Sequence, residues 1–183
     1  MKGLIKKMLK GHLVLKALPL LLVLFLFSCS AGKSQDSNMD QKAYDIINEH
    51  FKNGNDLKLY YQSDESSNWV DIIDIDSITR NVGTPVFIED DELKKIMSEE
   101  IVEELRTKIR NSETFEFEQT LLKNLILSKD GNSDAIKLSK PVVVGNIALL
   151  RRIDDLEIPI YIYRYESGKW KIIYTFYEKL IFH

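Results

Sequence analysis

Three closely spaced aspartates, Asp71, Asp74 and Asp76, are the acidic side chains whose spacing could support chemistry in this sequence. If residues 69–75 form an extended strand that continues to Asp76, then Asp74 and Asp76 point to the same face. Two carboxylates placed in this way could work as an acid and a base, or could hold a cation. The pattern also fits a polar strand face that leads into a turn. This second interpretation is favoured, because the sequence offers the aspartates no histidine partner.

A stripe of tyrosines near the C-terminus is the candidate binding surface. Tyr161, Tyr163 and Tyr165 alternate along a strand-like run, and Lys169 and Lys171 follow after a turn. Flat rings with hydroxyl tips are suited to contact with a sugar, a peptide or a protein surface. Because β-strands are ordinarily rich in tyrosine, burial of the stripe under a second layer, such as the first helix, is the favoured alternative.

Other groups that commonly perform catalysis are scarce. Beyond residue 28 the sequence contains two histidines, His50 and His183, and one cysteine, Cys29. It has no pair of histidines at metal-ligand spacing, no GxSxG motif, and no P-loop or GxGxxG motif. We therefore expect no catalytic residue, no metal ion and no cofactor.

The N-terminal segment has the charge and hydropathy pattern of a secretory signal. Five lysines precede an apolar run at residues 17–27, and no acidic residue occurs among them. A short apolar run behind a basic region is typical of a signal peptide. As a helix, the 11 residues of this run would rise only about 16 Å, roughly half of a hydrocarbon core. Residues 1–28 are therefore predicted to be a signal peptide rather than a membrane span.

A short motif, Leu26-Phe27-Ser28-Cys29, ends this run. It resembles the lipobox of bacterial lipoproteins, although Phe27 is bulkier than the small residue usual at its position. The resemblance covers residues 1–29. It implies that the signal is cut before Cys29, that the thiol receives a diacylglyceryl group and that the new N-terminus is acylated, for instance with palmitate. Since Cys29 is the only cysteine, it has no disulfide partner, which agrees with this role.

The lipobox also implies a location in the cell envelope. The protein would be anchored by lipid to a membrane and would face the periplasm or the exterior. Ser30 after the cysteine resembles sorting to the outer membrane in a cell that has one. The stretch from Ser30 to Asp40 contains one large apolar residue, Met39, so residues 29–40 are predicted to be the lipidated cysteine and a flexible tether.

The composition of the remaining chain limits its size class and its partners. Without residues 1–28 there are 155 residues, which is enough for one domain with its own core, and residues 41–183 are predicted to form it. This part has 20 basic and 28 acidic side chains, a formal charge of −8. Such a balance argues against nucleic acid as a partner and against electrostatic docking on anionic lipid.

Hydrophobic spacing predicts two helices and a hairpin in the first half of this domain. Apolar residues at helical spacing predict a helix over about 40–53 and a second, long helix from Asp90 to Arg110. Residues 57–62 and 69–75 read as the two strands of a hairpin, residues 84–88 as a short extended piece and residues 114–119 as a strand. On the long helix, four glutamates are expected on the solvent face: Glu99, Glu100, Glu103 and Glu104.

The second half of the domain predicts a four-stranded antiparallel meander. Its strands are residues 136–144, 147–153, 158–165 and 170–181, joined by short turns. Pro141 should lie at a strand end, an edge or a bulge. For the last hairpin we favour a turn that sets Tyr163 opposite Lys171. A two-residue turn at Ser167-Gly168 would pair Tyr165 with Trp170 and set two cations, Arg164 and Lys171, opposite each other.

The predicted fold class is α+β, with the first helix and the long central helix packed on an antiparallel sheet. The ending of the chain, with Gly168-Lys169-Trp170-Lys171-Ile172 after a strand, resembles the C-terminal meander of small uncharacterised bacterial lipoproteins. It is more distantly similar to the cone-shaped sheets of the cystatin and nuclear-transport-factor type. This resemblance covers residues 136–182 and implies a fold rather than an activity.

Three functional hypotheses follow from these observations. The first is a lipid-anchored binding or adaptor module of the cell envelope, without catalysis, whose partner is an envelope protein or a saccharide. The second is an envelope hydrolase built on the three aspartates. The third is an inhibitor of a secreted enzyme. A hydrolase requires a concave pocket where carboxylates converge, whereas a binding module requires an exposed surface without converging acids.

Overall fold

The computed structural model describes residues 33–54, 56–64, 67–130, 134–154 and 157–178. The predicted signal peptide and lipobox lie outside these ranges. The residues from Gln41 onward form one compact unit. The elements in chain order are α2 (Lys33–His50), β1 (Leu57–Tyr60), the 3₁₀ helix η1 (Ser67–Ile72), α3 (Ile75–Arg80), α4 (Asp90–Ile96), α5 (Glu99–Arg110), the 3₁₀ helix η2 (Gln119–Leu121), β2 (Leu125–Ser128), β3 (Lys137–Leu138), β4 (Val142–Val144), β5 (Ile147–Ile153), β6 (Ile158–Glu166) and β7 (Lys169–Glu178).

The main sheet confirms the predicted antiparallel meander and the α+β class. β5, β6 and β7 pair in sequence order, and both β3 and β4 pair with β5. The first predicted strand is therefore interrupted at residues 139–141. Pro141 lies in this interruption, as expected for a residue that has no backbone N–H to give to the sheet.

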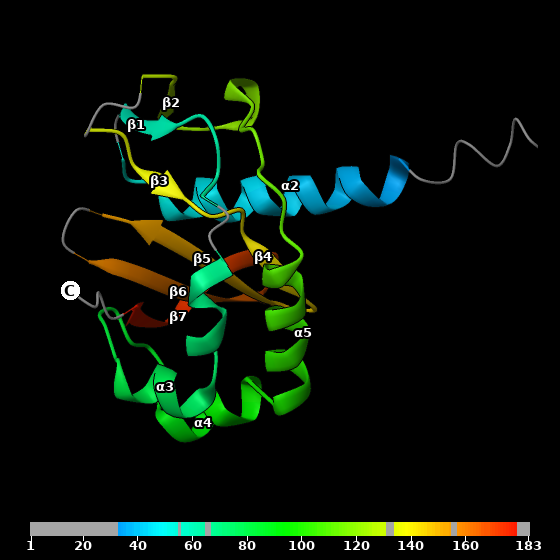
Figure 1. Ribbon diagram of the computed structural model, residues 1–183, viewed down its shortest axis with the longest axis vertical. Helices are drawn as coiled ribbons and strands as arrows, with labels where there is room; N and C mark the ends of the chain where they lie inside the picture. Colours follow the sequence, from blue (N-terminus) through cyan, green and yellow to red (C-terminus); the bar gives the residue numbers. More distant parts are fainter. Residues whose placement is uncertain (1–32, 55, 65–66, 131–133, 155–156, 179–183) are drawn as a thin grey trace, which may run out of the picture. The chain divides into compact units, whose positions relative to one another are not determined.

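Two layers cover the two faces of this sheet (Figure 1). One core cluster, here called the α2-side core, joins α2, β1 and β2 to one face, through residues such as Ile47, Leu59 and Tyr163. The other, the helical-layer core, joins η1, α3, α4 and α5 to the opposite face, through residues such as Trp69 and Leu105. The two helices predicted to pack on the sheet thus lie on opposite faces, because the sheet is apolar on both.

The register of the last hairpin is the one that sequence analysis ranked second. Tyr165 pairs with Trp170, and Arg164 pairs with Lys171. Ser167 and Gly168 have φ values of 50° and 82°, which a two-residue turn of type I′ requires. The expected repulsion between the paired cations is offset because Glu166 forms ion pairs with both of them. The prediction that Tyr163 faces Lys171 was wrong for this reason.

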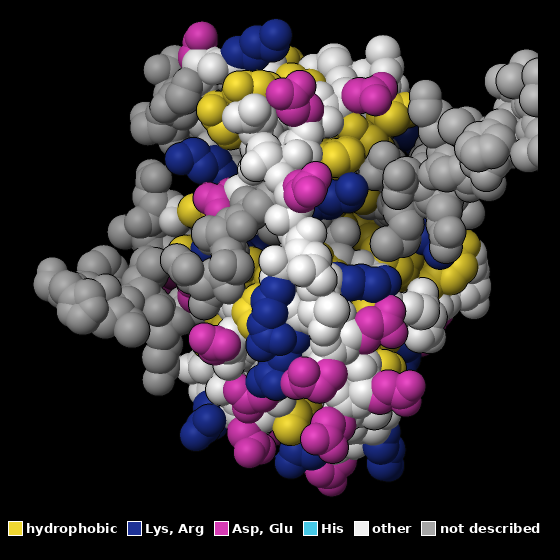
Figure 2. Space-filling model, turned by 45° about the vertical axis from the view of Figure 1, so that its right-hand side comes forward, with side chains coloured by type: hydrophobic (Ala, Val, Ile, Leu, Met, Phe, Trp, Pro, Cys, Tyr) yellow, Lys and Arg dark blue, Asp and Glu magenta, His cyan; other side chains and the backbone are white. Residues whose placement is uncertain are grey.

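Two predicted helix boundaries also differ from the structure. α2 begins at Lys33, so the segment predicted as a flexible tether is helical from that residue on. The long central helix is divided into α4 and α5, because the Oγ atom of Ser98 accepts a hydrogen bond from the Ile101 N–H and caps the second helix. The predicted solvent face of α5 is confirmed, since its four glutamates are exposed. Figure 2 shows acidic side chains gathered over the end of the molecule where α4 and α5 lie.

The predicted hairpin at residues 57–75 was wrong. β1 instead pairs in parallel with β2, and residues 69–75 form η1 and the start of α3. Trp69, Val70 and Ile73 are all buried in the helical-layer core, and their spacing fits a helical turn better than a strand. Residues 114–119, predicted as a strand, contribute only an isolated bridge between Gln62 and Glu116 before η2 begins.

Candidate functional site

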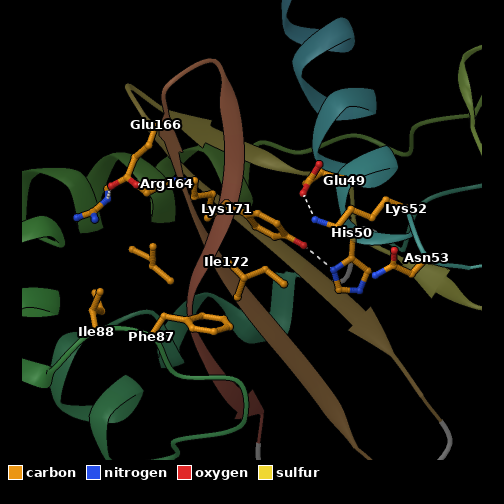
Figure 3. Close-up of a pocket in the computed structure, with 12 residues that line it drawn as sticks. Glu49, His50, Lys52, Asn53, Phe87, Ile88, Arg164, Glu166, Lys171 and Ile172 are labelled. Atoms are coloured by element: carbon orange, nitrogen blue, oxygen red, sulfur yellow. Dashed lines mark hydrogen bonds and ion pairs between the residues drawn. The ribbon is translucent and has the colours of Figure 1, made fainter.

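An open pocket of about 570 Å³ lies between the end of α2 and the hairpin of β6 and β7, and it is the candidate functional site. Figure 3 shows Glu49, Lys52 and Asn53 on one side of the hairpin, with Phe87 and Ile88 on the other. Its volume falls in the usual range for ligand sites, about 300 to 1,000 Å³. Phe87 is 66% exposed, the largest exposed fraction among the exposed large apolar side chains of the described residues.

His50, the last residue of α2, anchors the helix to the sheet beside this pocket. Its Nδ1 atom lies 2.5 Å from the hydroxyl oxygen of Tyr163 on β6 (Figure 3). The imidazole ring also packs edge-on against Phe51 and Tyr161. Tyr163 is completely buried, so the histidine supplies the hydrogen-bond partner that a buried hydroxyl needs.

The protonation states of this pair are set by burial. Burial, together with a smaller effect of the nearby charge of Arg152, lowers the pKa of His50 to about 4. Burial also raises the pKa of Tyr163 well above its usual value. At neutral pH both groups are therefore uncharged. A neutral histidine whose Nδ1 atom is occupied by a buried hydroxyl is suited to holding α2 in place.

The charged side chains that line the pocket are paired with one another. The Nζ atom of Lys52 lies 2.5 Å from a carboxylate oxygen of Glu49. Glu166 forms ion pairs with Arg164 and with Lys171. Arg164 also reaches Glu92 of α4 at 3.1 Å. The same pocket is lined by these pairs and by the apolar side chains Phe87, Ile88, Ile172 and Ile173.

A second pocket of about 400 Å³ adjoins the first along β7. It is lined by Lys169 and Trp170 of β7, by Lys123 and Asn124, and by part of α2. Glu49 and Lys52 line both pockets. The two pockets together therefore follow the N-terminal half of β7 alongside the end of α2.

The structure divides the five residues of the candidate binding surface. Tyr163 is buried under α2 and Tyr161 is half-buried, which agrees with the alternative that the first helix covers the tyrosines. Tyr165 is 47% exposed and its ring lies 5.1 Å from that of Trp170. Lys169 and Lys171 are exposed. All except Tyr161 line one of the two pockets, so most of the predicted residues surround the candidate site without forming one exposed face.

The three aspartates do not converge. Asp71 is exposed on η1, and Asp76 is exposed in the first turn of α3. Asp74 is the N-cap of α3, and its carboxylate accepts a hydrogen bond from the Ser77 N–H at 2.9 Å. Burial opposes ionisation of this carboxyl, but hydrogen bonds from Ser77 and Asp76 and the nearby charge of Arg106 outweigh it, so the pKa of Asp74 is lowered. Residues 69–75 do not form the predicted strand that would have aligned the three aspartates. Asp74 caps a helix instead, which explains its hydrogen bonds.

Neither a metal centre nor a membrane span is found in the part of the chain that the structure describes. Within it, no group of three or more histidine, cysteine, aspartate or glutamate residues lies close enough to hold a metal ion. None of the described helices combines the length and the hydropathy that crossing a membrane requires.

The role of His50 could not be predicted from the sequence. The histidine could be seen at the end of a predicted helix, but its partner Tyr163 is 113 residues away in the sequence. Each of the two residues belongs to an apolar pattern that another element must bury. These patterns do not show that the two residues contact each other.

Comparison of the chain with protein-family models, with curated proteins and with solved structures gives no match. The resemblances to bacterial lipoproteins and to the cone-shaped sheets therefore remain predictions from the sequence.

Proposed function

We propose that this chain is a lipid-anchored protein of the cell envelope whose folded part binds a partner without catalysing a reaction. The lipobox sequence at Cys29 supports the anchor and the location. The observation that carries the binding role is the open pocket beside α2, which is lined by an exposed Phe87, by its apolar neighbours and by paired charges. Apolar centres with polar rims are typical of surfaces that recognise a partner.

The chemistry of the pocket favours binding over hydrolysis. His50 is neutral and hydrogen-bonded to a buried hydroxyl, so it is poorly placed to take a proton from a substrate. The two glutamates of the lining each form an ion pair with a lysine, so neither presents an unpartnered carboxylate to a substrate. Asp71, Asp74 and Asp76, on which the hydrolase hypothesis was built, lie outside this pocket.

Photo-crosslinking at Phe87 tests the binding role. The variant carries a benzophenone amino acid in place of Phe87 and is expressed in full length in cells with an intact envelope. The matched control carries it at Ile126 of β2, which is 48% exposed and does not line the pocket. We expect a discrete crosslinked product from position 87 and none from position 126. The same products from both positions, or none from position 87, would contradict a binding role for this pocket.

A further inference from the structure

Among the described residues, the outer edge of β7 has backbone partners along only half of its length. Residues 81–87 form a strap along the C-terminal half of the strand, with Val82 in an isolated antiparallel bridge to Phe176. The backbone N–H of Gly83 donates to Thr175 O at 2.8 Å, and the N–H of Phe87 donates to Ile173 O at 3.0 Å. Residues 84–88, predicted as a short extended piece, contain no strand, and the Phe87 N–H supplies their backbone hydrogen bond to β7. Beyond Phe87 the chain turns away toward α4.

The N-terminal half of the same edge has no paired strand among the described residues. β7 ends the strand order of the sheet, and no further strand pairs with it from Lys169 to Ile172. Because Glu166 and Lys169 adjoin a two-residue turn, they form a hydrogen-bonded pair, and the next pair, Tyr165 and Trp170, does not. The Tyr165 N–H accordingly points away from β7 and donates to Asn146 O. The backbone N–H and C=O of Trp170 point the opposite way, to the open edge.

The larger pocket surrounds this open edge from both faces of the sheet. Tyr163 and Ile172, which line it, belong to or pack against the α2-side core. Ile173 and Ile88, which also line it, belong to or pack against the helical-layer core. A cavity that reaches both faces of a sheet is centred on a strand edge. A strand added there would send alternate side chains to His50 on one face and to Phe87 on the other.

The charge around the edge identifies the kind of strand that fits. The two pockets are lined by five cationic side chains and by three acidic ones, Asp45, Glu49 and Glu166. The cationic ones are Lys52, Lys123, Arg164, Lys169 and Lys171. The side chains of Lys123 and Lys169 have no ion-pair partner within the described ranges, although the predicted mature chain as a whole is acidic. A second copy of this chain would bring the same lysines against each other, which is unfavourable.

We propose that the N-terminal half of β7 binds an extended acidic segment of a partner protein, which joins the main sheet as an additional strand in line with the 81–87 strap. This inference rests on the proposed binding function and specifies how the partner binds. Backbone hydrogen bonds to the edge supply affinity, and apolar side chains against Phe87 and Ile172 with acids near Lys123 and Lys169 supply specificity. Exposed edges that are not blocked are the usual sites for such strand addition.

Selection from a phage-displayed library of random seven-residue peptides by the purified full-length chain tests the proposal. We expect the enriched peptides to alternate apolar and other residues and to carry aspartate or glutamate. A Lys123→Glu, Lys169→Glu variant should bind the enriched peptide roughly tenfold more weakly. Both lysines are exposed, so the variant should fold as the unsubstituted chain does. Enrichment of no peptide, or of basic peptides, would overturn the proposal.

Hydrogen exchange then distinguishes the binding mode from binding in general. The enriched peptide should slow exchange of the Trp170 amide by roughly tenfold or more, while the Tyr174 amide, already inside the sheet, should change little. The same peptide with methylated backbone nitrogens keeps its side chains but should fail to bind. If the peptide binds without protecting Trp170, or if the methylated peptide binds equally well, strand addition is wrong. A crosslink at Phe87 would in that case still support the binding function.

Discussion

His50 illustrates how a single side chain couples the candidate site to the stability of the fold. It is the last residue of α2, it contacts two tyrosines of β6, and it borders the larger pocket. The neighbouring groups on the sheet are Tyr161, Tyr163 and the guanidinium of Arg152, none of which is an anion at neutral pH. A protonated imidazole would therefore be buried beside a like charge, and the carboxylate of Glu49, which lines the same pocket, is already paired with Lys52.

The pH dependence of stability should follow from this arrangement. The pKa of His50 is 6.5 when unfolded and about 4 when folded, so between these values the unfolded chain binds more protons. The contribution of His50 is then fully present above pH 6.5 and is lost as the pH falls toward 4. From this group alone we expect the free energy of unfolding to decrease by about 2 kcal/mol between pH 7 and pH 5. Urea unfolding at the two pH values measures it.

A His50→Gln variant is the control for this measurement. Glutamine can still hydrogen-bond to the Tyr163 hydroxyl but does not titrate, so the remaining pH dependence reports the other groups of the protein. The difference in pH dependence between the two proteins is the contribution of His50. Equal pH dependence in both would mean that the histidine is not buried in its neutral form.

At the scale of elements, the 81–87 strap determines how much of the β7 edge is open. At Gly83, an added Cβ atom would lie 2.6 Å from Cε2 of Tyr177. A larger residue there would require the tyrosine ring or the strap backbone to move. The strap thus blocks one half of the edge and leaves the other half available to a partner.

Replacement of Gly83 by alanine should detach the strap from β7. We expect the Gly83→Ala variant to lose about 1 to 3 kcal/mol of unfolding free energy, because the Tyr177 ring or the backbone has to move. Thermal or urea unfolding measures the loss, and faster exchange of the Phe87 amide locates it. Val86→Ala is the matched control in the same strap, since Val86 is exposed and its replacement should change stability by less than about 0.5 kcal/mol. Similar losses of unfolding free energy in the two variants would contradict a close contact between Gly83 and Tyr177.

The elements differ in how far they could be predicted from the sequence. The meander was predictable because its strands are neighbours joined by short turns, such as Gly145-Asn146 and Ser167-Gly168. The pairing of β1 with β2 was not, since nothing near Leu57 indicates a partner at Leu125. The division between α4 and α5 had a readable signal, because Ser98 followed by Glu99 and Glu100 is a typical helix start. The apolar face continues across this boundary from α4 into α5, and it therefore favoured the prediction of one long helix.

The candidate site was less predictable than the fold. Four of its predicted residues do line the two pockets, because the register that the turn imposes brings them there. The favoured register was wrong since it relied on repulsion between Arg164 and Lys171 and did not include Glu166 as their shared partner. Phe87 and Glu49 line the same pocket although they lie far from β6 and β7 in the sequence. Contacts between such distant segments cannot be predicted from a local sequence pattern.

At the scale of the whole molecule, the lipid anchor is the property that the proposed location depends on. A palmitate-based probe should label the unsubstituted chain, and Cys29→Ser should abolish labelling and release the protein from the membrane fraction. A Ser28→Ala variant keeps the cysteine and a small residue before it, and it should label normally. An intact mass that retains residues 1–28 and carries no acyl group would contradict the anchor.

The wide separation of α2 from its sheet partner bears on the order in which the protein can assemble. His50 and Tyr163 are 113 residues apart, so α2 leaves the ribosome well before β6, the strand on which it packs. The strands of the meander, in contrast, emerge next to their partners. Contacts between sequence neighbours form first, because they close the shortest loops. The C-terminal half of the chain should therefore fold first on a nascent polypeptide, and α2 should dock on it last.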